Sequence, residues 1–479
     1  MNAEQPHLPR VLGLAGLSLF LVAALVNLNS IPVVGSIGPA AFVFWVLGFL
    51  FFFLPQSVAV IELSSRFPQE GGIYTWSKRA FGNFHGFLSG WCYWTNNIFY
   101  IPTLLFYIVG FAAFVGGEAT SGLANDPFMM SLISLALLWI ITGFNIIGLR
   151  FASIIQALGV AGTALTASIL VVVGVVAVRS HGIANPLESG SVATAFGDWR
   201  TLSLLSIVCL NFVGLELGSV MGDELKEPRR IIPRAVLIAG GVTILLYLVA
   251  TSALQASIPA SEIGIIDGIL QGVHRTATQL NMLWVVAPVA ILMSLNAAGN
   301  ASAWLAGSAR IPFVIGIDRF LPAAFGSIHP RFHTPHVSLA VQAFASSLFI
   351  IISAIGASVR DMYLVLLQTT VILQLIPYLY MFAALVVIRR DPKRYGAGEG
   401  FFRSTPIVSA MGIVGFLVTL AGVLLAFIPP AGVTDIWNFE VKTTLGAASF
   451  LIPALILFAL KARRIRRASL IPTPVRVPD

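Results

Sequence analysis

Charge and cysteine are both scarce in this sequence of 479 residues. Asp, Glu, Lys and Arg together make up only 10% of it, whereas soluble domains carry roughly a quarter. A soluble globular protein is therefore excluded. The two cysteines, Cys92 and Cys209, both fall inside long apolar runs. A structural disulfide or a thiolate zinc site is not expected from them.

Several signature motifs of enzymes and channels are also missing. Without a Walker-type phosphate loop, ATP-driven transport by this chain alone has no support. The sequence also lacks a Gly-x-Ser-x-Gly elbow and a His-Glu-x-x-His pair, so hydrolysis within the membrane has no support either. A potassium-channel filter of the TVGYG type is absent too. We therefore expect neither an enzyme nor a bound cofactor.

Three histidines that lie close together in the sequence, His329, His333 and His336, raise the question of a metal site. They alternate with Pro330 and Pro335, and no carboxylate or thiolate stands nearby. Metal sites usually combine such ligands with defined geometry and second-shell acids. A rigid interfacial loop is the better interpretation, and we expect no metal.

Long apolar runs dominate the remainder of the chain, which is 57% hydrophobic with a mean hydropathy of +0.91. About twelve runs are long enough to cross a bilayer as helices. Strands of a membrane barrel would be shorter and alternating. We predict an all-α polytopic membrane protein whose spans cover approximately residues 11–34, 38–63, 84–116, 128–149, 152–178, 201–222, 233–257, 283–309, 335–357, 361–388, 406–428 and 443–462.

The basic residues give the orientation. Of the 28 lysines and arginines, 23 fall on the side that holds both termini, and the other side has only Arg179, Arg200, Arg275, Arg360 and Lys442. Positive residues concentrate in cytoplasmic loops, so we predict an inner-membrane protein with the N-terminus (1–10) and the basic tail (463–479) in the cytoplasm. The tail suits contact with anionic lipid. The net charge of +8 does not indicate nucleic acid, given this distribution.

The first apolar run contains an anomaly, the stretch Asn27-Leu28-Asn29-Ser30-Ile31-Pro32. A lipid-exposed helix has no reason to carry these polar residues, and Pro32 cannot donate a backbone hydrogen bond. A broken helix is tolerated in the membrane only where protein or a water-filled cavity satisfies the freed groups. The stretch predicts a helix break near a binding site.

A second anomaly lies in the sixth run, where Glu216 stands among hydrophobic residues close to Phe212, Gly214 and Gly218. An acid at membrane depth is costly and marks a functional site or a protonated structural contact. Two interrupted segments five spans apart predict an inverted pair of repeats, 11–178 and 201–388, with 406–462 appended. The breaks would then face each other near the midplane.

Three groups of motifs, in this order, resemble the amino acid–polyamine–organocation transporters over nearly the whole chain. The first is Pro68-Gln-Glu-Gly-Gly-Ile-Tyr74 with Phe81-Gly and Gly90-Trp. The second is Phe212-Val-Gly-Leu-Glu216 followed by Glu224-Leu-Lys-Glu-Pro228. The third joins Ser308-Ala-Arg310, Asp318-Arg-Phe-Leu-Pro322 and Thr334-Pro335.

This resemblance implies a LeuT-like fold with 5+5 inverted repeats, twelve transmembrane helices and unwound helices 1 and 6. It also implies alternating-access transport of amino acids or related amines by proton symport or by exchange. In the arginine/agmatine branch, residues matching Glu216, Trp304 and Asn97 line or adjoin the substrate route. The usual Gly-Ser-Gly of helix 1 is missing, as in the glutamate/GABA antiporter and polyamine permease branches.

From these observations we expect a secondary transporter for an amino acid or amine. Backbone near Asn27, Asn29 and Ser30, with Phe212 and Gly214 opposite, would hold the substrate. Glu216 would pair with its ammonium or carry a proton, since a buried carboxylate responds to a nearby cation. A channel, or an amino-acid sensor on the same fold, remains an alternative.

Overall fold

A computed structural model describes residues 10, 12–68, 71–115, 126–186, 194–264, 267–318, 320–353, 359–429 and 435–469. Within these ranges the chain is helical throughout, apart from turns, loops and one isolated parallel bridge between Leu12 and Leu225. The expectation of an all-α protein with several membrane-length helices is confirmed. Most of the predicted N-terminal segment and residues 470–479 of the basic tail lie outside the described residues.

The first half of the chain opens with a short helix that is soon interrupted. Its elements are α1 (Leu14–Leu25), a 3₁₀ turn (Leu28–Ser30), α2 (Ile31–Gly35), α3 (Ala40–Gly48), a π-helical turn (Phe49–Phe53), α4 (Leu54–Arg66), α5 (Gly72–Phe81), α6 (Asn83–Thr95), α7 (Asn97–Val115), α9 (Pro127–Ile147) and α10 (Leu149–His181).

The second half begins with another interrupted helix. Its elements are α12 (Trp199–Leu202), α13 (Leu204–Asn211), α14 (Leu217–Val220), α15 (Pro228–Ser257), α16 (Gly268–Gln279), α17 (Val286–Ser308), α18 (Arg310–Ile317), α19 (His336–Ser353), α20 (Val359–Arg390), α21 (Thr405–Leu425) and α22 (Ile436–Ser469). The last helix continues into the segment that the sequence assigned to the tail.

Nine stretches among the described residues are long and apolar enough to span a membrane. The other three of the twelve predicted spans match weaker helices. The third is divided between α6 and α7 at Asn96, the sixth is divided between α13 and α14, and α19 is short.

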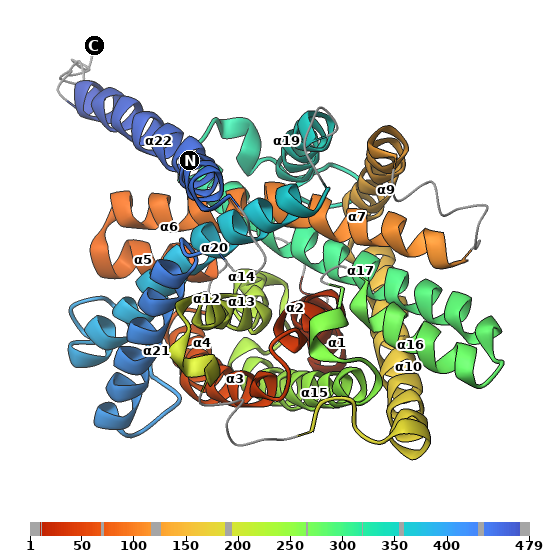
Figure 1. The fold of residues 1–479 in the computed structure, drawn as a ribbon. Coiled ribbons are helices and arrows are strands. Elements are labelled where there is room, and N and C mark those ends of the chain that lie inside the picture. The colour runs from red at the N-terminus through yellow and green to blue at the C-terminus, as the bar shows by residue number, and fades with distance from the viewer. Residues whose placement is uncertain are drawn as a thin grey trace, which may run out of the picture.

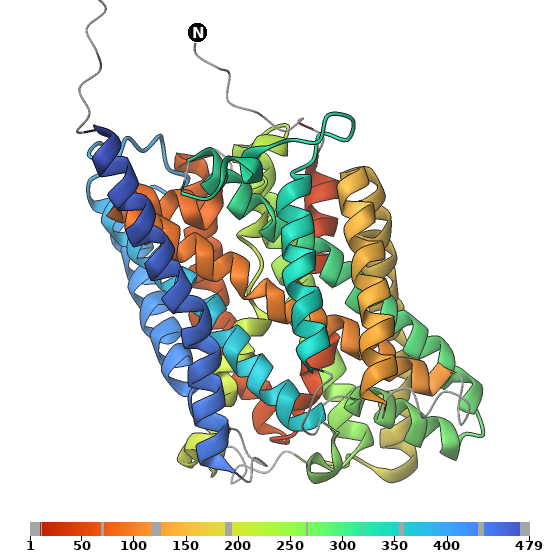
Figure 2. The same cartoon turned by 90° about the horizontal axis from the view of Figure 1, so that it is seen from above.

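The interrupted helices occupy the centre of the bundle. Figure 1 shows α1, α2, α13 and α14 in the middle, with α7, α10 and α17 on one side and α4, α20 and α21 on the other. Figure 2 shows helices such as α9 and α19 running along the long axis of the bundle, whereas α7 crosses it obliquely. A Cβ atom built on Gly159 of α10 would lie 2.8 Å from Cα of Gly299 on α17. These two helices therefore pack closely because both carry glycine where they cross.

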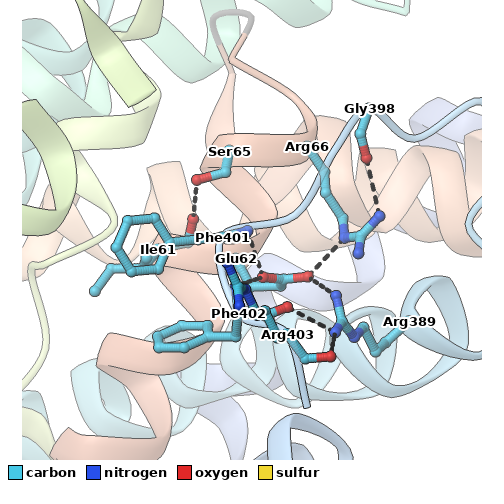
Figure 3. A network of polar contacts seen from close by, with 9 residues as sticks. All are labelled: Ile61, Glu62, Ser65, Arg66, Arg389, Gly398, Phe401, Phe402 and Arg403. Atoms are coloured by element: carbon cyan, nitrogen blue, oxygen red, sulfur yellow. Dashed lines mark hydrogen bonds and ion pairs between the residues drawn. The ribbon is translucent and has the colours of Figure 1, made fainter. Parts of the chain in front are cut away.

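A buried carboxylate ties α4 to the segment between α20 and α21 (Figure 3). Glu62 is fully buried and accepts hydrogen bonds from Arg66 Nε at 2.7 Å and Arg389 Nη1 at 2.6 Å. It also accepts from the backbone amides of Phe401 at 2.9 Å and Phe402 at 3.0 Å. Because four donors from three parts of the chain converge on it, Glu62 fixes one end of the bundle.

Two further ionic contacts join segments that adjoin the membrane spans. Arg310 pairs with Glu224, and both side chains are only 3% exposed. Lys78 Nζ lies 2.6 Å from Asp318, which also accepts a hydrogen bond from the Tyr74 hydroxyl. Burial, and then the Asp318 charge, raise the pKa of Tyr74. The phenol therefore stays protonated and donates to this carboxylate.

Candidate functional site

The first helix break begins after Leu25. Val26 and Asn27 adopt extended backbone conformations, and the 3₁₀ turn follows before α2 resumes the helix. The Asn27 side chain accepts a hydrogen bond from the Asn29 amide at 3.2 Å, so Asn27 caps the turn. Pro32 lies in the first turn of α2, where its missing amide hydrogen costs no helical hydrogen bond.

The second break separates α13 from α14 at residues 212–216. Gly214 has a φ of +132°, a backbone conformation that glycine adopts without the steric penalty that a side chain brings. Phe212 packs against Trp45, Phe53 and Tyr247, with ring centroids 5.4–5.9 Å apart. The aromatic anchor and the glycine together turn the chain out of the helix.

Tyr247 of α15 holds the two breaks together. Its hydroxyl lies 2.8 Å from the Leu25 carbonyl and 2.9 Å from the Asn211 carbonyl, and it accepts from the Asn27 amide at 3.3 Å. The Ser30 hydroxyl also donates to the Asn211 side chain. One phenol thus satisfies backbone groups that both breaks release, as a broken helix requires inside a membrane.

Side chains of α17 satisfy the carbonyls of the first break. Asn300 Nδ2 and Trp304 Nε1 each donate to the Ala24 carbonyl at 2.9 Å, and Asn296 Nδ2 donates to the Val26 carbonyl at 3.1 Å. The break therefore rests against a polar stripe on α17.

A cavity of about 20 Å³ lies between the two breaks and their neighbours. Amides, hydroxyls, one indole and apolar side chains line it, and among the described residues no carboxylate, ammonium, guanidinium or imidazole does. The lining residues are Ala24, Leu25, Asn27, Ser30, Asn96, Tyr100, Thr103, Leu104, Tyr107, Leu210, Asn211, Val213, Trp304, Leu367 and Gln374.

Glu216 lies beside this cavity without lining it. Its carboxylate is fully buried and accepts hydrogen bonds from Tyr93 at 2.7 Å, Gln56 at 3.1 Å and the Gly214 amide at 3.1 Å. The Trp304 ring lies 6.2 Å from the Tyr93 ring and 5.6 Å from that of Tyr100, which does line the cavity. Trp304 therefore lines the cavity and also packs toward Tyr93, one of the hydrogen-bond donors to Glu216.

Of the site residues expected from the sequence, Asn27, Ser30 and Trp304 line the cavity. Phe212, Gly214 and Glu216 form the second break and its hydrogen bonds, as described above. The Asn29 carbonyl accepts from the Tyr107 hydroxyl at 3.3 Å, and its side chain is buried away from the cavity lining. Asn97 donates to the Tyr93 carbonyl at 2.9 Å.

Several lining residues were not among the expected ones, chiefly Asn96, Tyr100, Thr103 and Tyr107. Their spacing of four, three and four residues is that of one helix face, so this polar stripe was visible in the sequence. Asn211 and Gln374 had no comparable signal.

Comparison with known proteins yields one family match and several relatives. The family model for amino acid permeases matches residues 11–450. An uncharacterized transporter of Legionella pneumophila is 27% identical over 94% of this chain and 96% of its own length. A glutamate/gamma-aminobutyrate antiporter of Lactococcus lactis subsp. lactis is 23% identical over 87% and 83%. A probable agmatine/putrescine antiporter from the same subspecies is 23% identical over 75% and 76%.

Proposed function

Because this chain belongs to the amino acid permease family, we propose that it is a secondary transporter that moves an amino acid or related amine across the membrane by alternating access. Two of the relatives are named as antiporters. Exchange and proton coupling are both compatible with the site. A permease carries its solute unchanged, so no catalytic residue is assigned.

The observation that carries this proposal is the meeting of two helix breaks at one cavity. α1 and α13 both stop there, and α2 and α14 both begin close by. Helix starts offer amide groups and a positive dipole end, and helix ends offer carbonyls. A zwitterion needs both, which is why broken helices serve transporters of such solutes.

In the proposed binding mode the substrate lies against the backbone of Asn27–Ser30 and Phe212–Gly214. The side chains of Asn27 and Ser30 contribute hydrogen bonds, and Trp304 forms one wall. Asn29 and Asn97 support this arrangement through their contacts with Tyr107 and Tyr93.

We assign Glu216 the part of proton carrier or partner of the substrate ammonium. Its donors, the hydroxyls of Tyr93 and Tyr378, the Gln56 amide and the Gly214 amide, satisfy an ionised carboxylate in the present conformation. Gly214 belongs to the break itself, so a shift of the break on substrate binding changes the hydrogen bonds of Glu216. That link would couple protonation to substrate occupancy.

The membrane arrangement follows from the positive residues. We propose twelve spans in two inverted repeats of five with two added helices, placed in the cytoplasmic membrane with both termini on the cytoplasmic side. The ion pairs of Glu62 and Glu224 would then lie near the cytoplasmic face.

The cavity is too small for an amino acid in this conformation. At about 20 Å³ it offers room for one or two water molecules, since a water needs about 10–15 Å³ of such cavity volume. Tyr100 accepts from Asn27 Nδ2 at 3.2 Å and donates to Asn300 Oδ1 at 3.1 Å across it. Substrate entry therefore requires Tyr100 and the first break to separate, as in alternating access.

Counterflow in proteoliposomes tests the proposal. Vesicles loaded with an unlabelled solute should accumulate the same labelled solute when purified protein is present, for at least one amino acid or amine of a panel. A sensor would bind a solute, measured as thermal stabilisation, without accumulating it. A channel would show single-channel current and no counterflow.

A further inference from the structure

We propose that the cavity selects amino acids that carry no net charge and whose side chain offers a hydrogen-bond acceptor, such as glutamine, asparagine, serine or threonine. The inference rests on the proposed transport function and concerns its substrate class. Two observations carry it: the uncharged lining of the cavity, and an unpaired amide donor in its wall.

The lining excludes charged substrate side chains. Among the described lining residues, the polar groups are amides, hydroxyls and one indole. Backbone groups of the two breaks, once released from Tyr247 and the α17 side chains, would supply partners for one α-ammonium and one α-carboxylate, and a third charge would have no counterion. Glu216 does not line the cavity, and its oxygens already accept hydrogen bonds from Tyr93, Gln56 and the Gly214 amide, so its part is limited to the proton or the α-ammonium. Burying an unpaired charge is costly, so we expect discrimination of at least about 100-fold against such solutes.

Gln374 supplies the unpaired donor. It is 1% exposed, lines the cavity from α20, and accepts through Oε1 a hydrogen bond from Asn96 Nδ2. Its own Nε2 has no partner among the described residues. A buried donor without an acceptor is unfavourable, and a substrate oxygen in the cavity removes that penalty.

The Asn96–Gln374 pair is placed to contact the substrate side chain rather than its backbone groups. Both residues belong to helices other than the broken ones, Asn96 at the junction of α6 and α7 and Gln374 in α20. Thr103 of α7 and Leu367 of α20 also line the cavity, so the wall formed by these helices has mixed polar and apolar character. A short side chain ending in a carbonyl or hydroxyl fits that chemistry.

The same helix offers a matched control. Gln368 is also fully buried on α20, and its Nε2 also lacks a partner among the described residues, but it does not line the cavity. Its Oε1 accepts from Ser206 instead. Replacing either glutamine removes the same amide from the same helix together with one accepted hydrogen bond, but only Gln374 contacts the cavity.

The test is uptake into proteoliposomes of labelled glutamine, serine, alanine, glutamate, arginine and putrescine. Wild-type protein should prefer the uncharged amino acids by at least about 100-fold. Gln374→Leu should lower the ratio of glutamine to alanine uptake about tenfold, since one hydrogen bond is lost. Gln368→Leu should leave that ratio unchanged. Gln374→Glu should shift preference toward arginine, a gain that misfolding cannot produce.

The outcomes separate the two proposals. Preference for glutamate, arginine or putrescine would overturn the substrate class while leaving transport established. An equal loss for glutamine and alanine in Gln374→Leu, or the same change of ratio in Gln368→Leu, would overturn the role of Gln374. Uptake of no solute by protein that is folded and monodisperse would overturn transport itself, and the substrate class with it.

Discussion

Replacement of Glu62 should destabilise the protein more than almost any other single change outside the apolar core. Glu62→Gln keeps the shape of the side chain but removes its charge, so Arg66 and Arg389 lose the anion that both contact in a buried setting. Breaking a buried ion pair in this way costs about 3–5 kcal/mol. Glu62→Ala also leaves the Phe401 and Phe402 amides without an acceptor, at about 1–3 kcal/mol each.

Thermal unfolding in detergent measures the effect. Cys92 and Cys209 are both free and buried, so a thiol-reactive fluorophore reports unfolding without any added label site. With an unfolding entropy of about 2 cal/mol/K per residue, a loss of about 4 kcal/mol lowers the melting temperature by about 4 °C in a chain of this length. Glu62→Ala should melt lower still.

An exposed ion pair supplies the control. Glu227 lies 3.2 Å from Arg230, with side chains 61% and 79% exposed, and exposed pairs contribute at most about 1 kcal/mol. Glu227→Gln should therefore melt within about 1 °C of wild type. If Glu62→Gln melted as close to wild type as this control, the reasoning from buried charge would be refuted.

Three other changes have defined outcomes. Tyr247→Phe removes the partner of backbone groups in both breaks, at about 1–3 kcal/mol, and should lower the counterflow rate; an unchanged rate would refute its role. Glu216→Gln should flatten the pH dependence of uptake in proteoliposomes, and unchanged uptake and pH dependence would contradict proton carriage. Replacing both Glu224 and Arg310, by Gln and Met, should cost less stability than Arg310→Met alone, because the single change leaves a buried carboxylate unpaired; a melting curve of each variant decides.

Most of the fold was predictable because membrane helices can be recognised from the length and the hydrophobic composition of apolar runs. The stretch around Asn27 and Pro32 and the residues around Gly214 stood out for the same reason, since polar, proline and glycine residues are conspicuous in an apolar run. The third, sixth and ninth spans were also recognisable as apolar runs, although polar residues interrupt the third and the sixth.

The cavity lining was only partly predictable, because the rotation of a helix about its axis decides which polar side chain faces inward. Asn96 lines the cavity and its neighbour Asn97 does not, although the two are identical in type and adjacent in sequence. Gln374 and Gln368 differ in the same way. Glu216 was conspicuous as an acid, yet the sequence could not reveal that its side chain does not line the cavity.

The distribution of charge in the structure suits a carrier that must open and close. The cavity wall is uncharged, whereas the ion pairs Glu224–Arg310 and Asp318–Lys78 join segments at the ends of different spans. In the closed state these pairs are wholly or partly removed from water and hold their segments together. When the bundle parts, water enters and solvates each charge separately, and a pair in water is worth little. Charged contacts therefore fix the geometry of a closed end and release at small net cost, whereas apolar contacts would expose hydrophobic surface on every opening.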